Sequence, residues 1–163
     1  MPLPYTQKER DDFQRNLNKG LVGEQIIQQQ LEKEGWVVYF PFDKTKAHLF
    51  DMLSTTLNAD CMACDVKTKR ALRLQDNFYT GFNVKHFDRY QQFAAKNQVP
   101  FYVYFVDDVY ETIHRVDLRN LEPGRAIGSN AHIYIWPMDK MEFVRKLTTD
   151  ENQMFVQLKT QKR

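Results

Sequence analysis

The stretch DCMACDVKTK, residues 60–69, places an aspartate and a lysine two positions apart inside a run that otherwise has the composition of a buried β-strand. Side chains two apart on a strand point to the same face, so Asp65 and Lys67 project together while Cys64, Val66 and Thr68 face the other way. A core ion pair explains these two charges as well as a functional site does, because a D-x-K tripeptide also occurs by chance. Residues elsewhere in the chain decide between the two interpretations.

Two further β-rich runs precede this strand, WVVYF (residues 36–40) and HLFDMLSTT (residues 48–56). Pro41 separates the first run from the second, and the turn-like LNAD separates the second from residues 60–69. Together the three runs predict an antiparallel meander. Apolar residues at helical spacing predict a helix over residues 18–35, ending at Gly35, and a second helix over residues 84–98. The strand predicted over residues 99–107 follows that helix directly, which favours a crossover, a parallel strand pair and a mixed sheet.

The remaining segments carry weaker patterns. We expect residues 70–83 to be irregular, strands over residues 110–116 and 131–136 with a loop over 120–130, a short helix over 139–147, and a loose basic tail over 157–163. The predicted fold class is α/β, with helices packed on a central mixed sheet in the order αβββαβ and a small C-terminal β/α extension. The core spans about residues 18–106 and the extension about 107–150.

Composition sets limits on the class of protein. A chain of 163 residues, of which 42% are hydrophobic, is long enough for one ordinary core, so we expect a single domain. The net charge of +2 does not by itself indicate nucleic-acid binding. No apolar run approaches the roughly 18 residues of a membrane span, and the N-terminus lacks an apolar signal region. These features predict a soluble, intracellular, cytoplasmic protein that does not bind membranes.

The two cysteines, Cys61 and Cys64, form a single C-x-x-C pair. A closed zinc site would need further ligands from the scattered histidines, His48, His86, His114 and His132. A redox role is disfavoured because the pair precedes a strand instead of opening a helix, where a thiolate would be stabilised. A small core residue and a turn thiol are the simpler interpretation.

Three acidic residues fall in apolar surroundings. On a helical wheel Leu17, Leu21, Ile27 and Leu31 form one stripe, and Glu24 lies near its middle, with Gly20 and Gly23 on the adjoining flank, where they would let the helix approach the sheet. Asp51 stands between apolar residues in the second strand of the meander, so it is expected within a few ångströms of Asp65. Carboxylates this close repel one another unless a cation lies between them.

This set of acids and one lysine fits a hard, oxygen-seeking cation such as Mg²⁺, with Mn²⁺ able to replace it. Asp51, Asp65 and the backbone carbonyl of Val66 are the predicted metal ligands, and Glu24 is expected to hold a water molecule or a second ion. Lys67 is expected to orient the attacking water or to stabilise charge on phosphorus. The alternative is a buried charge network that serves only structural specificity.

The order KGLVGE (residues 19–24), FD (50–51) and DVK (65–67) resembles the PD-(D/E)xK nuclease superfamily, and within it the archaeal-type Holliday junction resolvase group. The resemblance covers about residues 18–106. It implies a restriction-endonuclease-like core, Mg²⁺-dependent hydrolysis of a DNA phosphodiester, and catalytic roles for Glu24, Asp51, Asp65 and Lys67. Asp65 stands where many relatives carry glutamate, which the superfamily pattern tolerates.

Basic residues alternate with aromatic ones after the DVK motif, a pattern suited to phosphate contacts and base stacking. The predicted DNA contacts are Lys69, Arg70, Arg73, Lys85 and Arg89, and the interleaved aromatics are Phe78, Tyr79, Phe82 and Tyr90. His86 and Gln91 are candidate auxiliary groups, although a structural role explains each of them as well. Asp107 and Asp108 follow a strand and are better explained by a turn than by a metal.

The sequence therefore predicts a small Mg²⁺-dependent DNA endonuclease, with selectivity for branched structures as one option. The alternative is a catalytically inactive nucleic-acid-binding or interaction module with the same fold. DNA is the expected partner in either case. A homodimer would suit cleavage of both strands, because a two-fold axis presents two sites to strands of opposite polarity.

Overall fold

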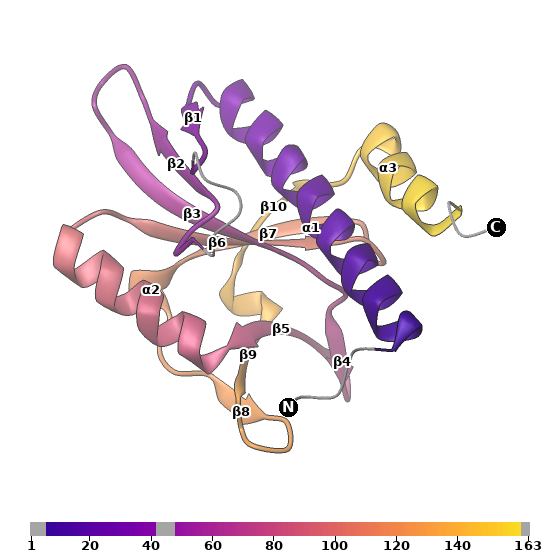
Figure 1. Ribbon diagram of the computed structural model, residues 1–163. Helices are drawn as coiled ribbons and strands as arrows, with labels where there is room; N and C mark the ends of the chain where they lie inside the picture. The colour runs from indigo at the N-terminus through magenta and orange to yellow at the C-terminus, as the bar shows by residue number, and fades with distance from the viewer. Residues whose placement is uncertain (1–5, 42–47, 161–163) are drawn as a thin grey trace.

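The computed structural model describes residues 6–41 and 48–160, and its elements form three layers (Figure 1). The middle layer is a six-stranded sheet in the order β1-β2-β3-β6-β7-β10. Helices α1 and α3 pack on one face of this sheet, and α2 packs on the other together with a second, four-stranded sheet, β4-β5-β9-β8. The helices are α1 (Gln7–Lys33), α2 (Val84–Asn97) and α3 (Thr149–Thr160).

The predicted meander and crossover are both confirmed. Strands β1 (Val37–Tyr39), β2 (Met52–Thr55) and β3 (Cys61–Thr68) pair antiparallel in sequence order. Helix α2 then leads into β6 (Phe101–Asp107), which pairs parallel with β3, so the sheet is mixed. Strand β7 (Thr112–Asp117) pairs antiparallel with β6 and continues the sheet.

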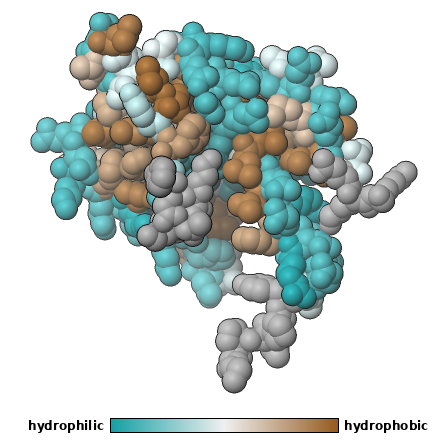
Figure 2. Space-filling model, turned by 45° about the horizontal axis from the view of Figure 1, so that its top comes forward, coloured by the Kyte–Doolittle hydropathy of each residue, from teal (hydrophilic) through white to brown (hydrophobic). Residues whose placement is uncertain are grey.

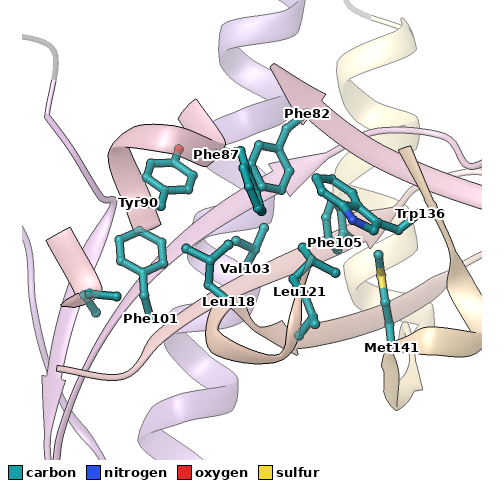
Figure 3. Close-up of a cluster of buried hydrophobic side chains, with 13 residues drawn as sticks. Phe82, Phe87, Tyr90, Phe101, Val103, Phe105, Leu118, Leu121, Trp136 and Met141 are labelled. Carbon is teal, nitrogen blue, oxygen red and sulfur yellow. The ribbon is translucent and has the colours of Figure 1, made fainter. Parts of the chain in front are cut away.

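The core is divided by the central sheet. On the α1 face, Ile26, Ile27 and Leu31 pack with Met52, Cys64 and Val66 of the strands and with Phe155 of α3. On the α2 face the core is largely aromatic, and Figure 3 shows Tyr90 opposite Phe101 at one end and Trp136 beyond Phe82 and Phe87 toward the other. The rings of Tyr90 and Phe101 are stacked with centroids 4.5 Å apart, which fixes the position of Tyr90.

Helix α1 begins eleven residues before the predicted start, because Thr6 and Glu9 form a capping box. Gly35 confirms the predicted stop, with φ of +90° just past the C-cap. The predicted apolar stripe on α1 is buried only in the C-terminal half of the helix. Buried positions begin at Gly23, so Leu17 and Leu21 remain 48% and 49% exposed, since that half of the helix does not pack on the core.

The expected close approach of α1 to the sheet occurs at Gly23 and not at Gly20. A Cβ atom on Gly23 would lie 1.8 Å from Oγ1 of Thr68, whereas a Cβ on Gly20 would have no neighbour within 4 Å. Gly23 therefore lets α1 pack closely on β3 at Thr68, the residue after Lys67.

Several predictions for the second half of the chain are wrong. Residues 70–83 are not irregular but contain β4 (Leu72–Leu74) and β5 (Asn77–Asn83), and the predicted 120–130 loop contains β8 (Arg125–Ile127). Strand β9 (Ile133–Pro137) pairs with both β5 and β8. Strand β5 pairs with a partner more than fifty residues away, with Gly81 opposite Ile135, and β4 and β8 are only three residues long, so local pattern carries little signal for any of them.

The predicted helix over residues 139–147 is also wrong, since Glu142–Lys146 form β10 on the edge beside β7. Of the tail predicted to be loose, residues 157–160 are helical, and residues 161–163 lie outside the described part of the chain. Helix α3 is held by Glu151, whose carboxylate binds Arg145 through both oxygens (2.7 and 2.8 Å) and accepts from Thr148 N at 2.8 Å. These ion-pair and capping contacts supply the order that composition did not indicate.

Figure 2 shows hydrophobic side chains reaching the surface in several groups among hydrophilic ones. The largest exposed apolar side chains include Phe13 on α1, Tyr39 on β1 and Phe78 on β5. Within residues 6–41 and 48–160, no helix is both long enough and apolar enough to cross a membrane.

Candidate active site

Asp51 lies just before β2, beside the part of β3 that β2 does not pair with. Its backbone N–H donates to the Cys64 carbonyl at 3.0 Å, and its Oδ2 accepts from Val66 N at 2.7 Å. Strand β2 starts only at Met52, so its pairing with β3 ends at Cys64. The Asp51 carboxylate accepts the hydrogen bond from Val66 N that a longer β2 would have accepted through its backbone. The N–H and C=O of one strand residue point to the same side, so the Val66 carbonyl also faces this edge.

Asp65 and Lys67 project from the same face of β3, as the strand alternation predicted. The Lys67 ammonium forms an ion pair with Oδ2 of Asp65. Asp65 is only 5% exposed, and the Lys67 ammonium is the cation at its Oδ2. One ammonium does not balance the charges of both Asp65 and the neighbouring Asp51, so the site retains capacity for a further positive partner.

The electrostatics of Asp51 show how much negative charge the site concentrates. Burial is the largest cause that raises the pKa of Asp51, to about 7, and the nearby Asp65 and Glu24 carboxylates add to it. The Val66 N–H and the Lys67 ammonium offset only part of that rise. The charges of Asp65, Glu24 and Lys67 thus all affect the ionisation of Asp51, and the four side chains lie near one another as the sequence predicted.

Glu24 comes from α1 and is half-buried. It shares a hollow of about 230 Å³ with Asp51, and the remaining walls are Leu17, Leu21, Phe40, Pro41, His48 and Phe50. Helix α1 and the start of β2 therefore place two acids on one concave surface, open to solvent beside β3.

Tyr90, one of the aromatics that the sequence suggested for base stacking, is instead buried beside Lys67. Its hydroxyl lies 3.3 Å from the Lys67 ammonium and 3.3 Å from Nδ1 of His86. Burial is the largest cause that raises the Tyr90 pKa, and Asp65 raises it further, so the phenol stays protonated. Helical spacing indicated only that Tyr90 faces inward; its position beneath Lys67 depends on the α2 crossover.

The two candidate auxiliary residues lie in different places. His86 is linked to Lys67 through Tyr90, and burial followed by the Lys67 charge lowers its pKa, which favours neutral imidazole. Gln91 is directed elsewhere: its side-chain amide donates to the carbonyls of Leu118 and Leu121, both at 3.2 Å. Its observed contacts are those of a structural residue.

The predicted DNA contacts differ in how they are held. The Lys69 ammonium binds the Gly81 carbonyl, and burial followed by the Lys67 charge lowers its pKa. The other four, Arg70, Arg73, Lys85 and Arg89, are exposed. Asp107 forms the expected turn, since its Oδ1 accepts from Val109 N and Tyr110 N, both at 2.8 Å.

The donor set fits Mg²⁺ better than zinc. Two carboxylates, a strand carbonyl and a concave surface are what Mg²⁺ uses, because it retains several waters and needs only one or two carboxylates from the protein. No group of three or more His, Cys, Asp and Glu side chains in the part of the chain described could hold a metal on its own. Cys61 and Cys64 are free and both lie on β3, and burial raises the pKa of Cys64, which disfavours its thiolate.

Comparison with known proteins bears on the fold. No protein-family profile matches the sequence, and no curated protein matches it. The structure is similar to Hjc, a Holliday junction resolvase from Archaeoglobus fulgidus, with 13% identity, a TM-score of 0.56, and coverage of 77% of this chain and 92% of that one.

Two other solved structures match more loosely. A bacterial homing endonuclease has 13% identity and a TM-score of 0.43, and covers 61% of this chain and 67% of its own. A nuclease from a fusselovirus has 12% identity and a TM-score of 0.42, and covers 98% of this chain and 96% of its own. On the likeness to Hjc, this chain has a restriction-endonuclease-like nuclease fold, with its acids and lysine on the meander and first helix of that fold.

Proposed function

We propose that this chain is a metal-dependent endonuclease that hydrolyses a DNA phosphodiester. The observation that carries the proposal is the convergence of Asp51 and Asp65 beside Lys67 in a buried position, where burial first and the neighbouring carboxylates second raise the pKa of Asp51 to about 7. Structural carboxylates are normally paired and hydrogen-bonded so that their charge is stabilised, whereas functional sites keep such perturbed groups.

Asp51, Asp65 and the Val66 carbonyl would hold Mg²⁺ or Mn²⁺, and Glu24, which shares the hollow with Asp51, would hold a water molecule or a second ion. When bound, the ion would supply Lewis-acid activation and neutralise charge on the attacked phosphate. Support comes from the oxygen-only donor set and from two neighbouring carboxylates that share a single lysine.

The protein's own groups would position the reactants. The Lys67 ammonium can leave Asp65 and donate a hydrogen bond to a phosphate oxygen or to the attacking water. Its contact with the Tyr90 hydroxyl would limit how far it moves. In-line attack forms a new phosphorus–oxygen bond while the bond to the leaving oxygen breaks. Exposed Lys85 and Arg89, on the helix that carries Tyr90, would hold the flanking phosphates.

We further propose branched DNA as a substrate, since the fold is shared with a protein named as a Holliday junction resolvase. A homodimer would allow two sites to act on two strands. Fold likeness alone does not define substrate, so the DNA structure is left to experiment.

The test is cleavage of a panel of labelled nucleic acids: supercoiled plasmid, linear duplex, four-way junction, flap, single strand and RNA. Each is incubated with Mg²⁺, Mn²⁺ or EDTA. We expect cutting of at least one DNA with either metal and none in EDTA. Binding without cutting under every condition would instead support the noncatalytic nucleic-acid-binding module, with the acids and Lys67 as a structural network.

A further inference from the structure

An arginine-aromatic cluster lies beyond the end of β3. It consists of Arg70, Arg73, Phe78 and Tyr110, which come from the β3–β4 connection, β4, β5 and the β6–β7 turn. Phe78 and Tyr110 meet edge to face with ring centroids 4.8 Å apart, and each is 38% exposed. A guanidinium lies over each ring: that of Arg70 is 5.8 Å from the Tyr110 centroid, and that of Arg73 is 6.0 Å from the Phe78 centroid.

One buried carboxylate fixes the two halves of this cluster. Asp107 is 2% exposed; its Oδ2 accepts from Ala71 N at 2.6 Å, and its Oδ1 accepts from Tyr110 N at 2.8 Å. The residue after Arg70 and the backbone of Tyr110 are therefore held by the same side chain. The cluster is preorganised, which lowers the entropy lost when a ligand binds.

A hollow of about 230 Å³ lies against the two rings, lined by Ala71, Phe78, Tyr110, Thr112, His114 and Met138. Its walls are apolar or aromatic, and the two arginines are exposed at the surface. Asp76 lies 4.0 Å from Arg73, but both side chains are largely exposed, so this contact neutralises little charge. Aromatic rings beside two exposed guanidiniums match a nucleobase with its phosphate.

We propose that Arg70, Arg73, Phe78 and Tyr110 form a platform that binds unpaired nucleotides of the DNA next to the cleaved phosphate. Bases in a closed duplex are stacked on one another and cannot reach the two rings, whereas an unpaired base can. Arg70 follows Lys67 by three residues of nearly extended chain, roughly 10 Å. One DNA strand can therefore reach both places within a few nucleotides.

The inference rests on the proposed function only in taking the bound strand as the substrate. Binding is therefore measured in EDTA, separately from cleavage. Fluorescence anisotropy compares a labelled duplex with the same duplex carrying a central unpaired tract. The variant Phe78→Leu/Tyr110→Leu keeps apolar volume and removes both aromatic faces. The matched control is Tyr39→Leu, an aromatic change on β1, at one edge of the central sheet, where Tyr39 is 51% exposed.

We expect the double variant to bind the DNA with the unpaired tract about tenfold more weakly than wild type, and the duplex within twofold. Tyr39→Leu should change neither. Equal losses on both DNAs, or no loss on either, would overturn the platform. If the leucine variant does not fold, Phe78→Leu alone is measured against the same two outcomes.

The two proposals fail in distinguishable ways. If wild type cuts DNA with Mg²⁺ but the variant shows no selective loss of binding, the platform is wrong and the nuclease proposal stands. If the selective loss is seen but no DNA is cut, the platform stands and the nuclease proposal is wrong.

Discussion

At the scale of single residues, Asp51 combines a strand-ladder role with an unfavourable charge. Its carboxylate accepts from Val66 N, yet burial and the Asp65 and Glu24 charges raise its pKa to about 7. The folded protein therefore binds a proton more tightly than the unfolded chain, in which the aspartate pKa is near 3.9. Ionised Asp51 costs stability, and a divalent cation would relieve that cost.

This imbalance predicts a pH effect on stability. Between about pH 4 and pH 7 the folded state holds the proton that the unfolded state has lost, so in EDTA the free energy of unfolding should fall as pH rises through this range. Asp51→Asn removes the effect and keeps an oxygen acceptor for Val66 N. We expect it to be more stable than wild type at pH 8 by about 1–3 kcal/mol, measured by urea denaturation. Equal stability of the two proteins at pH 8 would contradict this.

Metal addition should separate the same two proteins. Mg²⁺ binds the folded state and should raise the Tm of wild type as its concentration increases, by mass action. Asp51→Asn lacks one of the two central carboxylates and should show little shift. Differential scanning calorimetry with and without EDTA measures both, and an equal Mg²⁺ shift in the two proteins would place the metal elsewhere.

Tyr90 should act through Lys67. Tyr90→Phe keeps the stack on Phe101 and removes the hydroxyl that contacts Lys67 and His86. We expect kcat to fall about tenfold with little change in KM and Tm, since a positioning contact is lost without a binding contact. The control is Tyr104→Phe, which removes a buried hydroxyl that binds Arg115 on the other face of the sheet. Equal effects of the two changes would show that the loss is structural.

At the scale of elements, the packing of α1 on β3 depends on one glycine. Gly23→Ala would bring a Cβ atom to 1.8 Å from Thr68 Oγ1, so the helix must shift, at a cost of about 1–3 kcal/mol. Gly20→Ala has open space around it and should stabilise the helix by up to about 1 kcal/mol.

Chemical denaturation of both alanine variants measures this contrast. Adding Thr68→Ala to Gly23→Ala removes the clashing oxygen and should recover part of the loss, which a helix-propensity effect alone would not do. Similar stabilities for the Gly20 and Gly23 variants would rule out the close-packing explanation.

Local pattern predicted the elements that build the site and missed β4, β5, β8 and β10. The meander, both long helices and the parallel crossover follow from alternation, helical spacing and glycine or proline breaks in the sequence. Strands β4, β8 and β10 are three to five residues long and are stabilised by pairing with β5, β9 and β7. Such strands carry too few side chains to show a period.

The candidate site likewise contains some residues whose positions local pattern predicts and others whose positions it does not. Asp65 and Lys67 on one strand face, and Asp51 beside them, follow from strand geometry and a turn. Tyr90 and Tyr110 do not, because a helix crossover and a turn fixed by Asp107 bring them into place. Their sequence patterns are those of ordinary core and turn residues.

At the scale of the whole molecule, binding of DNA should depend on exposed charge more than on net charge. The chain carries only +2, but Lys85 and Arg89 stand exposed on α2 near Lys67. Lys85→Ala/Arg89→Ala should lower the slope of log K against log salt by about 1 to 2, because fewer counterions are released. Lys33→Ala/Lys146→Ala, on exposed positions of α1 and β10, should leave the slope unchanged. Equal slopes for the two double variants would remove α2 from the DNA-binding surface.

The central claim is that the Asp51, Asp65 and Lys67 group cleaves DNA. Its most direct test is single-turnover cleavage, with Mg²⁺, of whichever DNA wild type cuts best, by Asp65→Asn and by Lys67→Ala. Asp12→Asn, which changes an exposed aspartate on α1, is the matched control, and circular dichroism verifies folding. We predict at least a hundredfold loss for both site variants, with wild-type rates for the control. Folded Asp65→Asn and Lys67→Ala proteins that cut DNA at the wild-type rate would contradict the account.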